Sequence, residues 1–369
     1  MTHETAAAGI DGLRVRFYQE GDEPQLLDLL TRAFGRWPSV EIDVAPIEHL
    51  RWKLSAAPQQ DCYHSVAEID GRIVAAQLCV LHRFRAAYGP VVALRTWDAA
   101  VHPGHQGRGL IGELRRFFRD QVRDRAAFET GAFTRNPIMQ HVLERDGQVV
   151  LGAAMETAIA PLTLASAVST AKLTPGRAPA ELARSAALLA RWVRSRRSPR
   201  EAGTTVRTVE RFDERAARLV DEASRAFDYL IDRTPSFLDW RYADQRGGRF
   251  TIRLAEERDQ LVGYAVLRET GRRAYVADLL ALPGRLDVVE DLGRDALAAF
   301  RRRGATSVQC LIPSEHPYRP VLASCGFVGR RRRKEAFSVI PLSASPEELA
   351  FLQRPGLRLH LMLGDSDTI

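Results

Sequence analysis

The residues whose types and spacing most clearly indicate chemistry form a short glycine-containing segment, His105 to Gly109. A run of strand-forming residues ends just before it, and apolar side chains recur at helical spacing after it. Glycines at such a turn let several backbone N–H groups point outward at the start of a helix, where they bind phosphate. Arg108, between two glycines, adds a cation. The predicted ligand-binding residues are Val101, His105, Gln106, Gly107, Arg108, Gly109, Leu110 and Ile111.

A second block of residues, 128–147, follows the predicted helix. It contains a strand-like run, Asn136, a short helical stretch and Gly147, which begins another strand-like run. In these spacings the two blocks together resemble the GNAT superfamily, the acyl-CoA-dependent N-acyltransferases. The resemblance implies that acetyl-CoA or another acyl-CoA is the co-substrate, that Asn136 adds to its site, and that no metal takes part. The match is partial, because Gly104 stands where the family loop has Gln or Arg.

The resemblance also implies that the strand before the loop offers a backbone N–H to the acyl carbonyl. Asp98 is the acidic residue nearest this point, and two-residue alternation places it on one face with Thr96 and Ala100. Asp98 is therefore the candidate base for the amine proton, although a carboxylate here can also simply hydrogen-bond a neighbouring strand or loop. Many family members carry, at the position of Leu143, a Tyr that can protonate the departing CoA thiolate. In this chain the candidates for that proton are His141 or solvent, and the alternative is that the unit has lost its catalytic acid.

Several elements must position these residues in the first part of the chain. Strand-like runs are expected at 13–17, 63–69, 73–84, 91–101 and 128–133, and helical spacing at 24–36, 47–54 and 110–127. The turn Asp70-Gly71 between two apolar runs predicts a hairpin. This order of elements is the one that the resemblance implies.

The second half repeats the same order. Strand-like runs at 251–254, 261–267 and 275–282 lead to the turn Pro283-Gly284, a helix at 286–303 and a strand at 307–312. We therefore expect an α/β (α+β) fold of two tandem GNAT-like units, each a mixed, mostly antiparallel sheet flanked by helices. The expected boundaries are 13–164 for an acyl-CoA-binding domain, 165–204 for an Arg/Ala/Pro-rich linker with an amphipathic helix, and 205–369 for a degenerate GNAT-like domain.

The turn of the second half has a single glycine, Gly284, so its phosphate cradle is shorter and CoA is not expected there. Trp240 and Tyr242 flank Arg241 in a compact aromatic patch. They are candidates for contacting the acceptor, although such residues more often anchor a core.

Composition limits the possible partners. The chain has 369 residues, 45% hydrophobic and 27% charged, as in soluble globular proteins, and a net charge of +7 that suits an anionic ligand. The basic run Arg330 to Lys334 lacks any accompanying nucleic-acid motif, so a solvated strand edge is preferred over RNA binding. The basic linker helix is expected to pack on the protein, with contact to an anionic membrane as the alternative. Four cysteines without metal or disulfide spacing, and no signal peptide, indicate a cytoplasmic protein.

The main hypothesis is an N-acyltransferase that moves an acyl group, in the simplest case acetyl, from acyl-CoA to a primary amine of a small molecule such as an amino sugar or secondary metabolite. One alternative is a catalytically silent CoA-binding module, which Leu143 favours. Another is an aminoacyl-tRNA-dependent transferase, which the basic runs favour and the CoA-type loop disfavours. Neither the acceptor nor the oligomeric state follows from the sequence.

Overall fold

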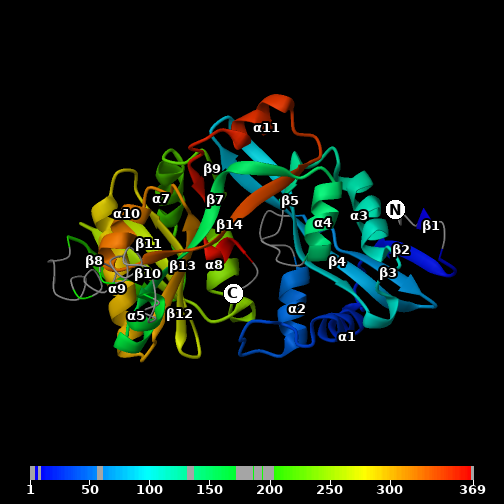
Figure 1. Ribbon diagram of the computed structural model, residues 1–369, viewed down its shortest axis with the longest axis horizontal. Helices are drawn as coiled ribbons and strands as arrows, with labels where there is room; N and C mark the ends of the chain where they lie inside the picture. The colour runs from blue at the N-terminus through cyan, green and yellow to red at the C-terminus, as the bar shows by residue number, and fades with distance from the viewer. Residues whose placement is uncertain are drawn as a thin grey trace. The chain divides into compact units, whose positions relative to one another are not determined.

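A computed structural model of the chain describes residues 5–6, 10–55, 61–130, 137–171, 186, 193 and 203–366 (Figure 1). The chain forms two compact units. The first unit comprises Met1–Gly152, Asp244–Gly248 and Ala336–Leu357, and the second comprises Ala153–Ala243, Arg249–Glu335 and Arg358–Ile369. Each unit is therefore discontinuous in the sequence, whereas one continuous range was expected for each. Most of the expected linker 165–204 lies outside the described residues.

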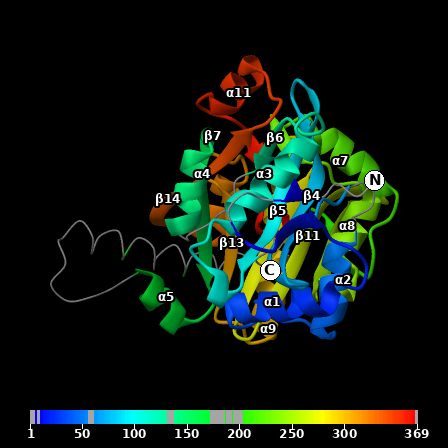
Figure 2. The ribbon, with the colours of Figure 1, turned by 90° about the vertical axis from the view of Figure 1, so that its right-hand side faces the viewer.

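The first unit is built on one mixed sheet. Its strands follow in the order β1 (Thr5–Ala6), β2 (Leu13–Phe17), β3 (Ser65–Ile69), β4 (Arg72–Ala86), β5 (Gly89–Val101), β6 (Phe128–Thr130) and the last part of β14 (Val328–Pro341). Neighbouring strands are antiparallel except β5 and β6, which are parallel. The helices are α1 (Glu23–Phe34), α2 (Pro46–Leu54), α3 (Leu110–Val122), α4 (Pro137–Arg145) and α11 (Pro346–Gln353). Figure 2 shows β4 and β5 side by side along their length.

Alternating side chains of the central strands divide this unit into two apolar layers. On one face Cys79 of β4 belongs to a core with Leu114 and Phe118 of α3. On the other face Leu78 belongs to a core with Leu30 of α1 and Leu50 of α2. The helices therefore cover opposite faces of the sheet, and the strand that precedes the predicted loop runs between them.

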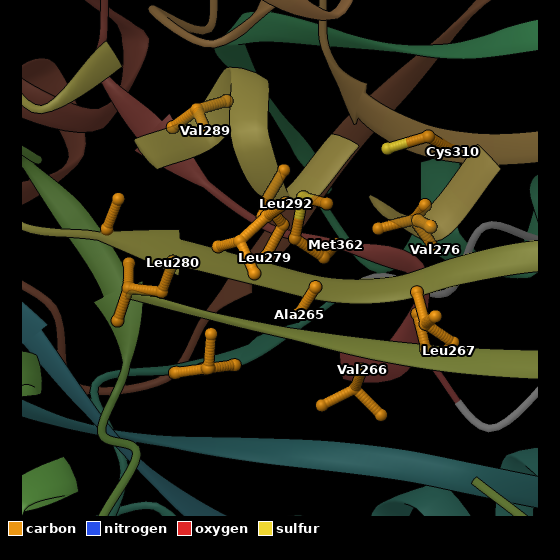
Figure 3. Close-up of a cluster of buried hydrophobic side chains, with 14 of the residues drawn as sticks. Ala265, Val266, Leu267, Val276, Leu279, Leu280, Val289, Leu292, Cys310 and Met362 are labelled. Atoms are coloured by element: carbon orange, nitrogen blue, oxygen red, sulfur yellow. The ribbon is translucent and has the colours of Figure 1, made fainter. Parts of the chain in front are cut away.

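The second unit repeats this architecture. Its sheet follows the order β7 (Val149–Pro161), β13 (Ser307–Pro313), β12 (Arg273–Ala281), β11 (Gln260–Thr270), β10 (Thr251–Glu257) and β8 (Thr205–Val209). Two short strands, β9 (Tyr229–Ile231) and β15 (Leu359–His360), pair in parallel. The helices are α5 (Leu164–Ala171), α7 (Arg215–Ser224), α8 (Pro235–Tyr242), α9 (Leu286–Arg302) and α10 (Arg319–Cys325). Figure 3 shows part of the apolar core, in which Leu279 of β12 lies beside Leu292 of α9.

The expected fold class is confirmed, because each unit is a mixed sheet flanked by helices in the same element order. All four cysteines are unpaired thiols, and Cys79 and Cys310 are buried in the strands that the sequence indicated. Among the described residues, no helix combines the length and the apolar character needed to cross a bilayer.

Candidate functional site

The glycine-containing loop leaves β5 through a short 3₁₀ turn, Pro103–His105, and begins α3 at Leu110. Gly107 and Gly109 both have φ of 77°, in the left-handed region that L side chains rarely adopt. A Cβ atom on either glycine would meet nothing within 4 Å. The backbone conformation, and not crowding by protein atoms, therefore requires glycine here, and the space in front of the loop is open.

The amides of this loop have the property that anion binding needs. The N–H of His105 donates to the carbonyl of His102 at 2.8 Å, and the helix proper resumes with Glu113, whose N–H donates to Gly109 at 3.2 Å. Between them, in the part of the chain that the structure describes, the N–H groups from Gln106 to Gly112 donate to no protein acceptor. These amides lie at the positive end of the α3 dipole, which attracts negative charge.

Two side chains add to the loop's chemistry. Arg108 is exposed, so its guanidinium is available to an anion in front of the loop. Partial burial lowers the pKa of His105, and the charge of Arg108 adds to the effect. Nδ1 of His105 has no hydrogen-bond partner among the described residues. A neutral imidazole with an unused nitrogen can bind a phosphate oxygen or a ribose hydroxyl in one of its tautomers.

The described pairing of strands β5 and β6 lies before the loop. It is parallel and runs from Ala93 with Phe128 to Arg95 with Thr130. We name the last described pair, Arg95 and Thr130, the fork. Asn136, a predicted cofactor contact, lies outside the described residues.

A β-bulge changes the side-chain alternation at the fork. Leu78 of β4 lies opposite Asp98 and Cys79 lies opposite Thr96, so Trp97 is an extra residue. The Thr96 hydroxyl donates to Glu129 at 3.2 Å, on the face that α3 covers. Asp98 instead faces α2. The expectation that Thr96, Asp98 and Ala100 share one face is therefore wrong for Thr96, because one inserted residue reverses the alternation.

Asp98 is paired with a buried lysine that the sequence analysis did not select. Nζ of Lys53, on α2, lies 2.5 Å from Oδ2 of Asp98, and the two side chains are 6% and 13% exposed. The ammonium also lies 5.8 Å from the ring of Trp37 and 5.7 Å from that of Trp97. Lys53 follows His49 and Leu50 at helical spacing on the buried side of α2. A charge on an apolar helix face needs a partner, and that signal was available in the sequence.

A buried ionic network supports the fork on its other face. Arg115 of α3 donates two hydrogen bonds of 2.8 Å to Glu129 and one of 2.8 Å to Asp146. Burial disfavours the charge of Arg115, but the two carboxylates outweigh it and raise its pKa. Burial likewise opposes the ionised form of Asp146, yet the guanidinium lowers its pKa. This network ties the first turns of α3 to β6, so that the loop and the fork keep their relative position.

The remaining predicted residues lie in different surroundings. His141 is exposed on α4, whereas Leu143, on the same helix, is buried. Val101 ends β5 half-buried, and Leu110 is buried in the α3 core, so that its amide alone faces the loop. Tyr242 is buried in the second unit, where its hydroxyl donates to Asp278 at 3.3 Å. Trp240 packs on Phe237 in the same helix, with ring centroids 5.8 Å apart.

The equivalent turn of the second unit is closed by the protein itself. The N–H of Arg285 donates to Leu282 at 3.1 Å, and the N–H of Leu286 donates to Gly284 at 2.9 Å. The guanidinium of Arg285 pairs with Asp287 and Glu257, each at 2.8 Å. Amides and cation are therefore both occupied at the start of α9, in contrast to the loop before α3.

No protein-family model matches the chain, and no curated protein matches its sequence. Solved structures do match its fold. A GCN5-related N-acetyltransferase from Anabaena variabilis is similar with a TM-score of 0.61 at 9% identity, over 89% of this chain and 72% of that one. N-myristoyltransferase from Saccharomyces cerevisiae, with bound myristoyl-CoA and inhibitors, is similar with a TM-score of 0.60 at 10% identity, over 98% and 89%.

A tandem GNAT protein from the clavulanic acid biosynthesis pathway is also similar, with a TM-score of 0.54 at 17% identity, over 90% of this chain and 99% of that one. At these identities the likeness establishes the fold. The chain has a GNAT fold, and the alignment over nearly the whole length of a tandem protein agrees with the repeated architecture described above.

Proposed function

We propose that this GNAT-fold chain is an acyl-CoA-dependent N-acyltransferase, with the donor bound by the first unit. One observation carries the proposal: the amides from Gln106 to Gly112 form a helix start without protein acceptors among the described residues. Exposed amides at a helix start are available to an anion, and a pyrophosphate supplies several acceptors at once.

Acyl-CoA fits the residues that are present. Its pyrophosphate would accept hydrogen bonds from the loop amides, with Arg108 adding charge and His105 an unused ring nitrogen. Hydrogen bonds to a charged group contribute about 1.5–3 kcal/mol each, so a few of them suffice for micromolar binding. Asn136 and the backbone N–H near Val101 stay predicted contacts. Acyl-CoA supplies an activated thioester, so that positioning provides much of the rate.

The proposed reaction is direct transfer. The amine nitrogen attacks the thioester carbonyl, a C–N bond forms, and the C–S bond breaks. The proton leaves the nitrogen, and Asp98, on the α2 face just after the bulge, is the group that we propose accepts it. His141 is exposed, so water can equally supply the proton that the departing thiolate takes up. The acceptor is a small primary amine, such as that of an amino sugar or a secondary metabolite.

The second unit has a different role in this proposal. Its loop amides and Arg285 are bonded to protein atoms, so a second CoA is not expected there. Tyr242 is buried against Asp278, which supports a structural role for this predicted acceptor contact. Trp240 remains a candidate at the acceptor side.

A matched pair of variants tests donor binding. Gly109→Val in the first loop and Gly284→Val in the second impose the same strain, since both glycines have φ of 77° and open space around the absent Cβ. We expect Gly109→Val to weaken acetyl-CoA binding by at least about tenfold in calorimetry, whereas Gly284→Val binds as wild type. Equal loss in both variants, or no binding by the wild type to any acyl-CoA, contradicts the proposal.

Turnover separates the enzyme from a silent binding module. Release of CoA thiol with a panel of amines, lowered at least about tenfold but still measurable in Asp98→Asn while acetyl-CoA binds as in the wild type, supports the transferase. Binding without thiol release over the whole panel supports the silent module instead.

A further inference from the structure

Each unit places an aspartate at the equivalent position of its sheet, Asp98 in the first unit and Asp278 in the second. In β5 the extra residue of the bulge is Trp97, and Asp98 follows it. In β12 of the second unit, Val266 lies opposite Asp278 and Leu267 opposite Val276, so Ala277 is the extra residue and Asp278 follows it. Each carboxylate is therefore turned to the same face of its sheet by the same device.

The equivalent helix reaches that carboxylate in both units. Helices α2 and α8 both begin with a proline, Pro46 and Pro235, and Lys53 and Tyr242 lie at the same offset from it. Lys53 contacts Asp98 at 2.5 Å, and the hydroxyl of Tyr242 donates to Asp278 at 3.3 Å. The equivalent helix position therefore carries a cation, Lys53, in the first unit and a neutral hydrogen-bond donor, Tyr242, in the second.

The second carboxylate is sealed. Asp278 is fully buried, and Arg233, Tyr264 and Tyr242 all donate to it. Burial would raise its pKa, but Arg233 outweighs burial and lowers it. Asp365 of the C-terminal segment also binds Arg233, at 2.7 Å. A carboxylate saturated in this way holds the fold together and cannot exchange a proton with a ligand.

The first carboxylate is less deeply buried than the second. Asp98 keeps 13% of its side-chain surface exposed, whereas Asp278 keeps none. Its cation, Lys53, lies 5.8 Å from the ring of Trp37 and 5.7 Å from that of Trp97, and these rings restrict the movement of the ammonium. The pair therefore combines a held cation with a carboxylate that keeps some exposed surface.

We infer that Lys53 is the positioning residue of the acyl transfer, acting through Asp98, and this inference rests on the proposed function. The ammonium holds the carboxylate ionised and aimed at the amine on the α2 side of the bulge. When the C–N bond forms and the C–S bond breaks, the amine proton passes to Asp98 and then to water, and the thiolate takes a proton from water. Lys53 keeps its own protons throughout, so the step balances without it.

Three histidines lie next to Lys53 or to the tryptophan rings around it. His49 lies on α2, with its Nδ1 2.6 Å from the carbonyl of Arg246, and His82 lies on β4, 6.1 Å from the ring of Trp97. His64 precedes β3; burial, helped by the charge of Lys53, lowers its pKa to about 4. His64 therefore stays neutral in the range where an acid limb of activity would be measured, whereas His49 and His82 need their own Gln variants as controls.

The test uses the full chain and an acceptor that the wild type acylates. In Lys53→Met we expect kcat to fall by at least about tenfold and the acid limb of kcat/KM to move to higher pH, because a carboxylate without its cation takes up a proton more readily. Lys53→Arg keeps the charge and restores the wild-type limb. Acetyl-CoA binding is unchanged in both. The double variant Lys53→Met/Asp98→Asn is no slower than Asp98→Asn, since Lys53 acts through that carboxylate.

Tyr264→Phe is the matched control, because it removes a donor from the equivalent carboxylate of the second unit and should leave the pH profile unchanged. An unshifted limb in Lys53→Met, or additive losses in the double variant, overturns the inference. Should Lys53→Met fail to fold, the same comparison is made between Lys53→Gln and Lys53→Arg. The acid limb of kcat/KM should then move in Lys53→Gln and keep its wild-type position in Lys53→Arg. If the wild-type protein acylates no amine, the proposed function itself is wrong. If the wild type is active but Lys53→Met leaves the pH profile unchanged, only the assignment of Lys53 is wrong.

Discussion

The guanidinium of Arg115 donates two parallel hydrogen bonds, each 2.8 Å long, to the carboxylate of Glu129. Both side chains are 2% exposed. Arg115 lies in the second turn of α3, and Glu129 lies in β6, paired with Leu94 of β5. This pair joins α3 to β6 through the interior of the first unit. It therefore holds the glycine-containing loop before α3 in a fixed position relative to the fork.

Removal of one partner should strongly destabilise the first unit. Arg115→Met leaves the buried Glu129 carboxylate with only Arg119, at 3.4 Å, as a cation, and breaking a buried pair costs up to about 3–5 kcal/mol. Arg32→Met breaks the surface pair of Arg32 and Asp28, whose side chains are 57% and 59% exposed, and should leave the free energy of unfolding nearly unchanged. Urea unfolding of both variants measures the difference. Similar values for the two would show that the buried pair is not holding α3.

Arg108 should contribute to donor binding through its charge. We expect Arg108→Gln to weaken acetyl-CoA binding by about three- to tenfold at low salt, and by less at high salt, because exposed charges are screened. Arg285→Gln removes the corresponding cation of the second loop, which is already paired with Asp287 and Glu257, and should leave the affinity unchanged. Calorimetric titration at two ionic strengths provides the comparison. A salt-independent effect of Arg108→Gln would contradict an electrostatic role.

The cysteines should be chemically silent in the folded protein. Burial raises the pKa of Cys62, Cys79 and Cys310 to about 12, and that of Cys325 to about 11. Only about one thiol in a thousand or fewer is ionised at pH 8 at such values, and the thiolate is the reactive form. A disulfide reagent should therefore label the native chain slowly and all four thiols after denaturation. Rapid labelling of Cys62 in the native protein would refute this prediction. If the native thiols react slowly, a thiol reagent can follow CoA release without background from the protein.

Acid should destabilise the second unit through a buried histidine pair. Nδ1 of His316 accepts from the N–H of Tyr318, so the proton of the neutral ring is on Nε2, 2.9 Å from Nδ1 of His360. Burial lowers the pKa of His316 well below its ordinary 6.5, with His360 contributing, and burial also lowers that of His360. The folded rings stay neutral while the unfolded chain takes up protons below pH 6.5, so stability is present above this pH and falls below it.

The expected loss from His316 is about 1.4 kcal/mol one pH unit below its unfolded pKa, and His360 adds to it in the same direction. Urea unfolding between neutral and mildly acidic pH measures it, and His316→Gln should reduce the slope because one titrating ring is removed. The His141→Gln variant, which changes an exposed ring, should keep the wild-type slope. A slope equal in all three proteins would rule out the buried pair as its cause.

The sequence by itself determined the features that are local in the chain. The left-handed glycines, the turn after Val101 and the helix that begins at Leu110 depend on neighbouring residues, and the structure has them as expected. The same applies to the repeated order of strands and helices. Backbone conformation and apolar periodicity are set within a few residues, so such features can be predicted from a single sequence.

Only the tertiary structure decided the chemistry around Asp98. Its partner Lys53 is 45 residues away, and the bulge at Trp97 depends on the register with β4. The discontinuous units, in which residues 336–357 complete the first sheet, likewise depend on which strand edges meet. One inserted residue reverses the face of every following side chain, and the sequence carries no local mark of where that insertion occurs. The loop was therefore predictable, and so was the need of Lys53 for a partner, but the sequence did not show that Asp98 is that partner.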